Sequence, residues 1–379
     1  MRRTLLCFLT LFLAVILDAQ GVYTCYNFDA PRVNTPAPEG YNVFYISHYG
    51  RHGARYIYSE NDYAVLDSVF SKASLTPLGK QVRDRFEALY PSLKGRAGEL
   101  SPLGEAQQYL LARRMMDELP EVFSRYSRVE AVSSDVPRCV RSMHFFLEGL
   151  RQGGKKRRIS GNVDASLLPA LKNGPVHFDN VDSLFLAGFD MVPVYERLFD
   201  NAQSAKELAD SLVFVRSLYY FCAHLPSAGF SREPLMEQAF SSVEWGVLNS
   251  LEDQKFSLHG GWSRPSNVAR IWPLVENFID EADLAIASGK KKVRLRFGHD
   301  NVLIPFMAFL KMGPFSAELF NCSDCPMGAN VRWVFASNKD DVLVKVQYNE
   351  SDVSQWMPWN EFRKDCLDKI AWAKQVLSK

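Results

Sequence analysis

Three basic side chains crowd into five positions near the start of the sequence, in the stretch YISHYGRHGARYIY at residues 45–58. Arg51, His52 and Arg55 stand around Gly53. Arginine offers a planar, permanently charged fork that binds phosphate oxygens two at a time, and glycine lets the backbone approach a ligand closely. From average residue usage, R-H-G-x-R arises by chance in such a chain with odds on the order of one in a thousand. The motif predicts a pocket for a strongly anionic group, with a solvated turn as the alternative.

The histidine of this motif has a chemistry of its own. Neighbouring positive charge lowers the pKa of an imidazole and favours its neutral form, whose nitrogen can attack phosphorus. His52 is therefore predicted to be the nucleophile of a phosphoryl transfer. His48 precedes it by four residues, as metal ligands can, but Gly50 and Gly53 argue against a helix there and no third ligand is evident. No metal is expected, and His48 is interpreted as structural.

Two later segments carry residues of matching chemistry. Arg138 lies in SSDVPRC, and His299 and Asp300 lie in FGHD. Asp300 can supply, as a general acid, the proton that a leaving oxygen needs. Alone, each signal is weak, because Arg138 could pair with a surface carboxylate and the His-Asp pair could cap a helix. Their shared context gives them weight.

Each of the three segments follows a predicted strand and precedes a predicted helix. The strands are expected at residues 41–47, 129–134 and 291–298, where aromatic and β-branched residues gather. In open α/β sheets ligands bind at the carboxyl ends of the strands, and helix N-termini there favour anions. The sequence therefore predicts that three arginines, two histidines and one carboxylate converge on one crevice.

The remaining pattern predicts an α/β fold with a helical insertion. Helices are expected at residues 76–93, 101–123, 135–150 and 301–313, the first opening with Thr-Pro and the second with Ser-Pro. A hairpin is expected at 330–349, with its turn near 338–341. Residues 165–285 look mainly helical. The expected division is a first core part at 21–150, a mainly helical cap insertion at 151–285 and a second core part at 286–379.

Composition sets limits on the partners of the chain. The formal net charge of +1, with 47% hydrophobic and 23% charged residues, is typical of a soluble globular protein and gives no global attraction to nucleic acid or membranes. The expected partner is a small phosphate ester, and no cofactor is implied. A basic run at residues 155–158 is expected to be a solvated loop.

The first 20 residues have the pattern of a secretory signal peptide. Arg2 and Arg3 precede an apolar run from Leu5 to Leu17, which is too short to span a bilayer. Cleavage is expected after Ala19 or Gln20, and the mature protein is expected to be exported, to a periplasm or to the medium. Oligomeric state leaves no signal in the sequence.

Six cysteines remain after such cleavage, and in an oxidising compartment they could form disulfides. They are Cys25, Cys139, Cys222, Cys322, Cys325 and Cys366. The C-x-x-C in NCSDCPMG could be a redox motif or half of a zinc site, but a structural bridge, within the motif or to other cysteines, is the preferred interpretation.

Taken together, RHGAR, the arginine in SSDVPRCVRS and FGHDN resemble the histidine acid phosphatases. RFGHDNVLIPFMAFL, ANVRWVF and VKVQYNE are most similar to the multiple inositol polyphosphate phosphatase and phytase-like branch. The resemblance implies an α/β core with an inserted helical cap. It also implies roles: His52 forms a phosphohistidine, Arg51, Arg55 and Arg138 hold the phosphoryl oxygens, His299 donates a further hydrogen bond, and Asp300 protonates the leaving alcohol.

Two departures from the branch leave the substrate open. His299-Asp300-Asn301 stands where the inositol polyphosphate phosphatases often have His-Ala-Glu, and matches bacterial phytases, glucose-1-phosphatases and acid phosphatases instead. The proline that often follows the motif's tyrosine is missing from RHGARYIY. Inositol polyphosphates remain the favoured substrates, and a sugar-phosphate or general acid phosphatase is the first alternative.

Two further alternatives come from other classes. A phosphotransferase of the phosphoglycerate mutase type shares the R-H-G start, but the expected export and the large insertion argue against it. A non-catalytic binder of phosphorylated ligands would need neither His52 nor Asp300. Arg83, Lys172 and Arg264 are candidates for basic side chains that line the cap and hold additional phosphates of a polyphosphate.

Overall fold

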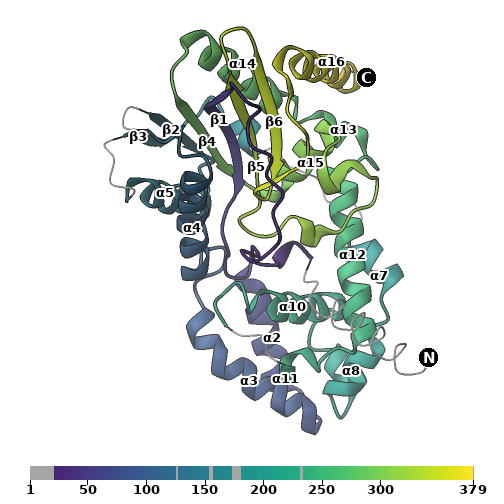
Figure 1. The fold of residues 1–379 in the computed structure, drawn as a ribbon. Coiled ribbons are helices and arrows are strands. Elements are labelled where there is room, and N and C mark those ends of the chain that lie inside the picture. The colour runs from purple at the N-terminus through teal and green to yellow at the C-terminus, as the bar shows by residue number, and fades with distance from the viewer. Residues whose placement is uncertain (1–20, 125–126, 153–156, 173–180, 231–233, 379) are drawn as a thin grey trace, which may run out of the picture.

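One eight-stranded sheet with helices on both faces forms the core of the computed structural model, which describes residues 21–124, 127–152, 157–172, 181–230 and 234–378 (Figure 1). The strand order is β3-β2-β4-β1-β5-β6-β7, with β8 beside β6. The strands are β1 Asn42–Arg51, β2 Arg128–Ser133, β3 Arg158–Val163, β4 Lys292–Gly298, β5 Asn330–Ser337, β6 Val342–Tyr348, β7 Ser351–Asp352 and β8 Met357–Pro358. The predicted signal peptide lies outside the described residues.

The three strands predicted to carry the site are neighbours. β1 pairs in parallel with β4, and β4 pairs in parallel with β2, so their carboxyl ends meet at one edge. The predicted hairpin is confirmed as β5 and β6, which run antiparallel on the other side of β1. β3 escaped prediction because it lies at the sheet border and its side chains are almost all exposed, which leaves no apolar alternation.

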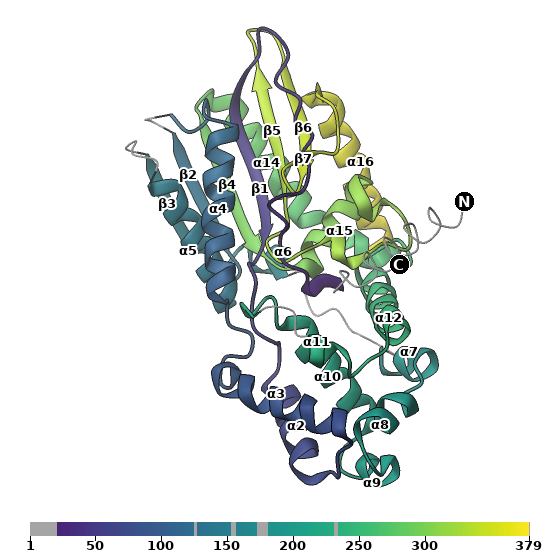
Figure 2. The same cartoon turned by 60° about the horizontal axis from the view of Figure 1, so that its bottom comes forward.

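Two helix pairs cover the sheet. α4 (Pro102–Glu118) and α5 (Pro137–Arg151) pack on one face, and α14 (Trp272–Ser288) and α16 (Trp359–Leu377) on the other (Figures 1 and 2). The Ser-Pro start of α4 is confirmed, because Ser101 Oγ accepts a hydrogen bond from the amide of Gly104 at 3.2 Å. The Ser101 cap and Pro102 determine the residue at which α4 begins, directly beside the end of β1.

A layer of helices lies beyond the carboxyl edge of the parallel strands, at the bottom of Figures 1 and 2. Its members are α2 Glu60–Lys72, α3 Pro77–Leu93, α7 Val181–Gly188, α8 Val192–Leu198, α9 Ala202–Lys206, α10 Ser211–His224, α11 Pro234–Glu237 and α12 Ser242–Gly260. We call this set the helical layer. α2 packs against α10, and α3 packs against α8 and α11.

These contacts modify the expected division of the chain. α2 and α3 precede residue 150 but lie in the helical layer, whereas β3 and most of α14 fall within 151–285 but belong to the sheet and its cover. Helical periodicity shows which face of a helix is buried, but it does not show which neighbour buries that face. The division into two domains therefore remains a proposal, with residues 60–93 added to the cap.

Short elements complete the fold: α6 Leu168–Lys172, α13 Pro265–Ala269, α15 Asp300–Leu310, and the 3₁₀ turns η1 Gly21–Tyr23, η2 Gly313–Ser316 and η3 Cys322–Asp324. Within the described ranges, no helix combines the length and the apolar character that a membrane crossing requires. Of the basic run, Arg157 and Arg158 are described. Arg158 begins β3, and Arg157 donates to the carbonyls of Phe123 and Leu150, so this end of the run is not a free loop.

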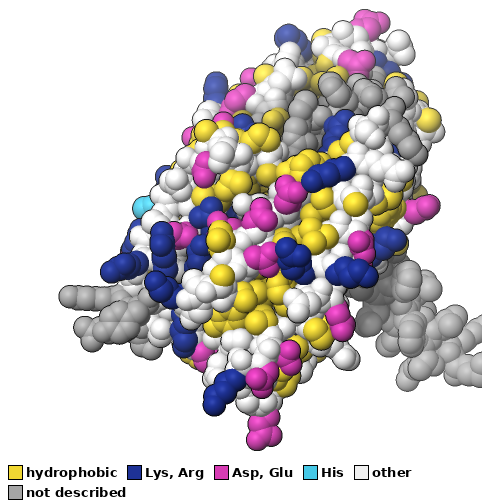
Figure 3. Space-filling model, turned by 90° about the horizontal axis from the view of Figure 1, so that it is seen from above, with side chains coloured by type: hydrophobic (Ala, Val, Ile, Leu, Met, Phe, Trp, Pro, Cys, Tyr) yellow, Lys and Arg dark blue, Asp and Glu magenta, His cyan; other side chains and the backbone are white. Residues whose placement is uncertain are grey.

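An extended arm, residues 24–41, leads back along the sheet from η1 to β1 (Figure 2). Tyr26 Oη donates to Glu350 at 3.0 Å, and the amide of Val33 donates to Ser351 Oγ at 2.8 Å. The arm thereby places η1 at the carboxyl edge of the strands, beside the predicted site. Figure 3 shows the opposite end of the molecule, where basic and acidic side chains are mixed, in keeping with the small net charge.

Candidate active site

All six predicted site residues lie at the carboxyl edge of β1, β2 and β4. Arg51 ends β1 and His52 follows it, while His299 is the N-cap of α15 and Asp300 its first residue. Arg138 is the second residue of α5, which follows β2. The predicted convergence of the three segments is therefore present in the structure, at the border between the sheet and the helical layer.

Arg51 is fully buried and joins four segments of the chain. Its Nη1 donates to the carbonyls of Val22 at 2.7 Å and Cys325 at 2.5 Å. Its Nη2 lies 2.6 Å from Asp300 Oδ2 and forms an ion pair. The predicted phosphate ligand and the predicted general acid are thus in direct contact in the free protein.

His52 is held in one tautomer. Its Nδ1 lies 2.9 Å from the carbonyl oxygen of Gly53, which can only accept, so Nδ1 carries the hydrogen and Nε2 carries the lone pair. Burial, followed by the charges of Arg138 and Arg51, lowers the pKa of His52 well below its usual value. The side chain is therefore a neutral imidazole with a nucleophilic Nε2.

His299 lies across from His52, with 5.8 Å between the ring centroids. Arg138 Nη2 is 3.4 Å from its Nδ1, and Ser134 Oγ is 3.3 Å from its Nε2. A guanidinium can only donate, so Nδ1 accepts and Nε2 carries the hydrogen. Burial, and then the charge of Arg138, lower the pKa of His299 to about 4.

The arginines of the site have donors left over. Arg55 Nη1 donates to the carbonyl of Tyr56 at 2.9 Å, and the guanidinium groups of Arg55 and Arg138 lie 5.6 and 5.8 Å from the ring centre of Tyr58. In Arg51, Arg55 and Arg138 alike, the buried Nε–H has no acceptor among the described residues. Buried unpaired donors are costly, so three of them around one imidazole favour a bound anion.

Asp300 is ionised in this arrangement. Burial alone would raise its pKa, but the adjacent Arg51, helped by His299, holds the pKa of the carboxyl below its usual value. An anion that binds Arg51 would weaken this effect and make proton uptake by Asp300 easier.

Two glycines let the backbone segments of the site meet. A Cβ on Gly53 would lie 2.4 Å from the carbonyl oxygen of Gly104, and one on Gly104 would lie 2.1 Å from that of Ala54. The N-terminal turn of α4 therefore packs directly on the RHGAR motif. A Cβ on Gly298 would lie 2.0 Å from Tyr49 Oη, which also accepts from the amide of His299 at 2.8 Å.

Several polar residues that support the motif were not predicted. Gln107 Oε1 accepts from the amide of Ala54 at 2.8 Å, Gln108 Nε2 donates to the carbonyl of Arg51 at 3.1 Å, and Ser142 Oγ accepts from the amide of Gly53 at 3.1 Å. Gln107 and Gln108 follow the Ser-Pro start of α4 and are both buried. Adjacent glutamines in the first turns of a helix that is close to the motif were the available signal.

The three basic residues suggested for additional phosphates differ in where they lie relative to the site. Lys172 pairs with Asp135 at 2.5 Å, and its carbonyl accepts from Asn301 Nδ2 at 3.4 Å, which places it beside the site. Arg83 pairs with Asp84 and Glu87 on α3, and Arg264 is the N-cap of α13. No contact of Arg83 or Arg264 with a predicted site residue occurs in the described part of the chain.

His48 and the cysteines have structural surroundings. His48 packs against the rings of Phe146 and Phe297, and burial lowers its pKa to about 3. No cluster of His, Cys, Asp and Glu suited to a metal occurs among the described residues. The expected disulfides are absent there as well, because all six cysteines are unbonded. Several thiols lie near main-chain carbonyls instead, as Cys139 does at 3.3 Å from that of Gly298.

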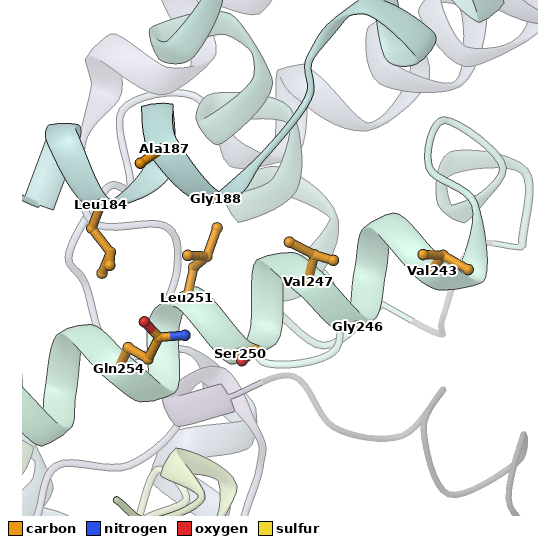
Figure 4. A pocket seen from close by; sticks show the side chains of 9 residues that line it. All are labelled: Leu184, Ala187, Gly188, Val243, Gly246, Val247, Ser250, Leu251 and Gln254. Carbon is orange, nitrogen blue, oxygen red and sulfur yellow. The ribbon is translucent and has the colours of Figure 1, made fainter.

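A separate cavity of about 450 Å³ lies between α7 and α12 (Figure 4). Its lining is made of apolar and small neutral residues: Leu184, Ala187, Gly188, Val243, Gly246, Val247, Ser250, Leu251 and Gln254. Such a lining offers no charge to a phosphate, so the cavity does not compete with the arginine cluster as the anion site.

Several solved structures share the fold of this chain. The multiple inositol polyphosphate phosphatase of Bifidobacterium longum, in complex with phosphate, matches with a TM-score of 0.72 at 14% identity, over 93% of this chain and 98% of that one. Its complex with inositol hexasulfate gives 0.71 at 15%, over 91% and 96%. The phytase from D. castellii gives 0.69 at 15%, over 94% and 86%.

These likenesses show that the chain has the fold of inositol polyphosphate phosphatases and phytases, as the motif resemblance implied. The predicted α/β fold class, which the resemblance to histidine acid phosphatases implied, is thereby confirmed. No family model and no curated protein matches the sequence.

Proposed function

We propose that this protein is an exported phosphomonoesterase that hydrolyses inositol polyphosphates through a phosphohistidine. One observation carries the proposal: a buried, neutral His52 with its Nε2 lone pair available stands among three arginines whose Nε–H groups find no acceptor in the described part of the chain. This arrangement combines a nucleophile with a cradle for a phosphoryl group. A non-catalytic binder would need the cradle but not the tautomer of His52.

In the first step, Arg51, Arg55 and Arg138 hold the phosphoryl oxygens while His52 Nε2 attacks phosphorus. A P–N bond forms as the P–O ester bond breaks, and Asp300, protonated in the substrate complex, gives its proton to the leaving oxygen. The Nε2–H of His299, which faces Ser134 in the free protein, would donate to a phosphoryl oxygen after a rotation of the ring. The arginines offset the charge that builds up on the phosphoryl group.

In the second step, the Asp300 carboxylate takes a proton from water, whose oxygen attacks phosphorus and breaks the P–N bond. His52 regains its neutral form and inorganic phosphate leaves. The residues account for both steps without a metal or an organic cofactor. The partner is a small phosphate ester, with no role for nucleic acid or membranes.

Two lines of support favour inositol polyphosphates. One is the fold shared with proteins described as an inositol polyphosphate phosphatase and as a phytase, one of them solved with inositol hexasulfate. The other is Lys172, a cation at the border of the site that could meet a second phosphate. The His299-Asp300 pair, which resembles glucose-1-phosphatases too, makes a sugar-phosphate phosphatase the second candidate. Export rests on the signal-like residues 1–20.

The test is phosphate release by residues 21–379 without added metal, measured from pH 3 to 8. Phytate, glucose 1-phosphate and 4-nitrophenyl phosphate are compared for wild type, His52→Ala and the surface control His144→Ala. We expect wild type and His144→Ala to prefer phytate and His52→Ala to be inactive. Preference for glucose 1-phosphate would select the second candidate, and an active His52→Ala would refute the mechanism.

A further inference from the structure

The helical layer contacts the arginine motif through the end of α10 and the turn that follows it. His224, the last residue of α10, is buried, and its Nε2 lies 3.2 Å from Arg55 Nη1. Its Nδ1 lies 2.7 Å from the carbonyl oxygen of Tyr220, one helical turn earlier.

These two contacts determine which nitrogen of His224 carries hydrogen. The carbonyl of Tyr220 can only accept, so Nδ1 is the donor, and the guanidinium of Arg55 can only donate, so Nε2 is the acceptor. Burial, and then the charge of Arg55, lower the pKa of His224 well below its usual value. His224 is thus a neutral acceptor held in one orientation by its own helix.

The same turn also holds the main chain of Arg55. Ser227 Oγ donates to the carbonyl of Arg55 at 2.7 Å, and Ser101 Oγ donates to the carbonyl of Ser227 at 2.6 Å. The ring of Tyr23, from η1, packs against His224, with 4.3 Å between the two ring centroids. Arg55 is therefore fixed at both ends by residues 224–227, which are themselves fixed by α4 and η1.

We propose that His224 is a positioning residue that orients the Arg55 guanidinium for phosphate, so that docking of the helical layer and phosphate binding are coupled. The inference rests on the proposed function and deepens it. Arginine has several rotatable bonds, and a bidentate contact needs its planar fork in one orientation. Arg55 Nη1 is bound to Tyr56 and His224, and its Nε–H, which has no acceptor among the residues that the structure describes, is left to meet a phosphoryl oxygen. Small misplacement of such a group costs on the order of a hundredfold in rate.

The test compares His224→Leu, which removes the acceptor, with His224→Gln, which can restore it through Oε1. His259→Leu is the matched control, because His259 is also buried near a helix C-terminus and its Nδ1 also meets the carbonyl four residues back. Each variant is measured for kcat and KM with 4-nitrophenyl phosphate, for Kd of inorganic phosphate by calorimetry, and for Tm. His224→Leu is also made in an Arg55→Lys background.

We expect His224→Leu to weaken phosphate binding and to lower kcat/KM by about 10- to 100-fold, with most of this loss restored in His224→Gln. In the Arg55→Lys background His224→Leu should add little, because the group that it positions is already gone. Equal losses in His224→Leu and His259→Leu, or the same loss in both backgrounds, would overturn the inference. If wild type hydrolysed no ester, the proposed function would fail, and the phosphate Kd values would still decide the role of His224.

Discussion

The two roles of Asp300, ion-pair partner of Arg51 and proposed general acid, require opposite protonation states. In the free protein it is the carboxylate partner of Arg51, whereas the proposed first step needs it protonated. A phosphoryl group bound to Arg51 supplies the negative charge that Asp300 otherwise provides, and this favours protonation of the carboxyl. Substrate binding thereby helps to prepare the acid that the reaction consumes.

This dual role leads to a prediction about leaving groups. Asp300→Asn should lower kcat for phytate by about 10²- to 10⁴-fold, because an alkoxide leaves poorly without a proton. The first-turnover release of 4-nitrophenolate, which leaves unaided, should slow by less than about tenfold. Steady-state turnover of both esters should slow in addition, because Asp300 also serves as the base for water in the second step. The alkaline fall of the phytate rate, which reports loss of the Asp300 proton, should disappear from the residual activity. First-turnover and steady-state rates from pH 3 to 8 check these outcomes.

Asp135→Asn is the matched control, since Asp135 is an exposed carboxylate at the edge of the same site that pairs with Lys172. It should not discriminate between the two leaving groups. An equal loss of the first-turnover rate for both esters in Asp300→Asn would show that Asp300 serves only as the partner of Arg51.

At the scale of elements, the contact between the RHGAR turn and the start of α4 controls the geometry of the cradle. The two backbones approach so closely at Gly53 and Gly104 that neither position has room for a Cβ. Because these atoms belong to the main chain, no side-chain rotation can relieve the overlap.

A single methyl group should therefore separate α4 from the motif. Gly53→Ala should lower the free energy of unfolding by about 1–3 kcal/mol and abolish phosphate release. Gly246→Ala is the control, because Gly246 lies inside α12 with nothing within 4 Å of an added Cβ, and it should be stabilising by about 0.5–1 kcal/mol. Urea unfolding and phytate hydrolysis measure both effects. A fully active Gly53→Ala would contradict this account of the turn.

The sequence allowed the site to be predicted where a functional residue directly follows a strand. The ends of β1, β2 and β4 could be matched to Arg51, Arg138 and His299 because parallel strands bring their carboxyl ends together. It was uninformative where tertiary packing decides. His224 lies 169 residues from Arg55, and nothing in the amphipathic pattern of α10 indicates that contact.

Contacts made by main-chain groups could not be predicted from the sequence either. The carbonyls of Val22 and Cys325 bind Arg51, but a carbonyl has no residue-type signature, so only the fold reveals the contact. The predicted disulfide of Cys325 does not form in the structure. Cys325, the C-cap of η3, instead contributes its main-chain carbonyl to the site.

At the scale of the whole molecule, the N-terminal turn η1 connects the sheet, the helical layer and the site. The Val22 carbonyl meets Arg51, while Tyr23 contacts His224 and donates to the buried Glu252 at 3.1 Å. Residues 21–23, which directly follow the predicted signal peptide, thus form part of the wall of the candidate site.

Removal of η1 should therefore disable the candidate active site that it contacts. A chain that begins at Cys25 should lose about a hundredfold in kcat/KM relative to one that begins at Gly21, because Arg51 and His224 lose their supports. Tyr23→Phe keeps the ring on His224 and should retain most of the activity. Rates with 4-nitrophenyl phosphate and Tm values separate loss of the site from loss of the fold. Equal activity of the two chains would contradict the role of η1.

The contacts of Arg51 also determine when the site can exist during folding. They join residues 22, 51, 300 and 325, and the arm adds a link between Tyr26 and Glu350. Such non-local contacts give a high contact order, and loop closure must precede each of them. The cradle cannot assemble during synthesis while the second half of the chain is still missing. The proposed affinity for phosphate should therefore arise only at the end of folding.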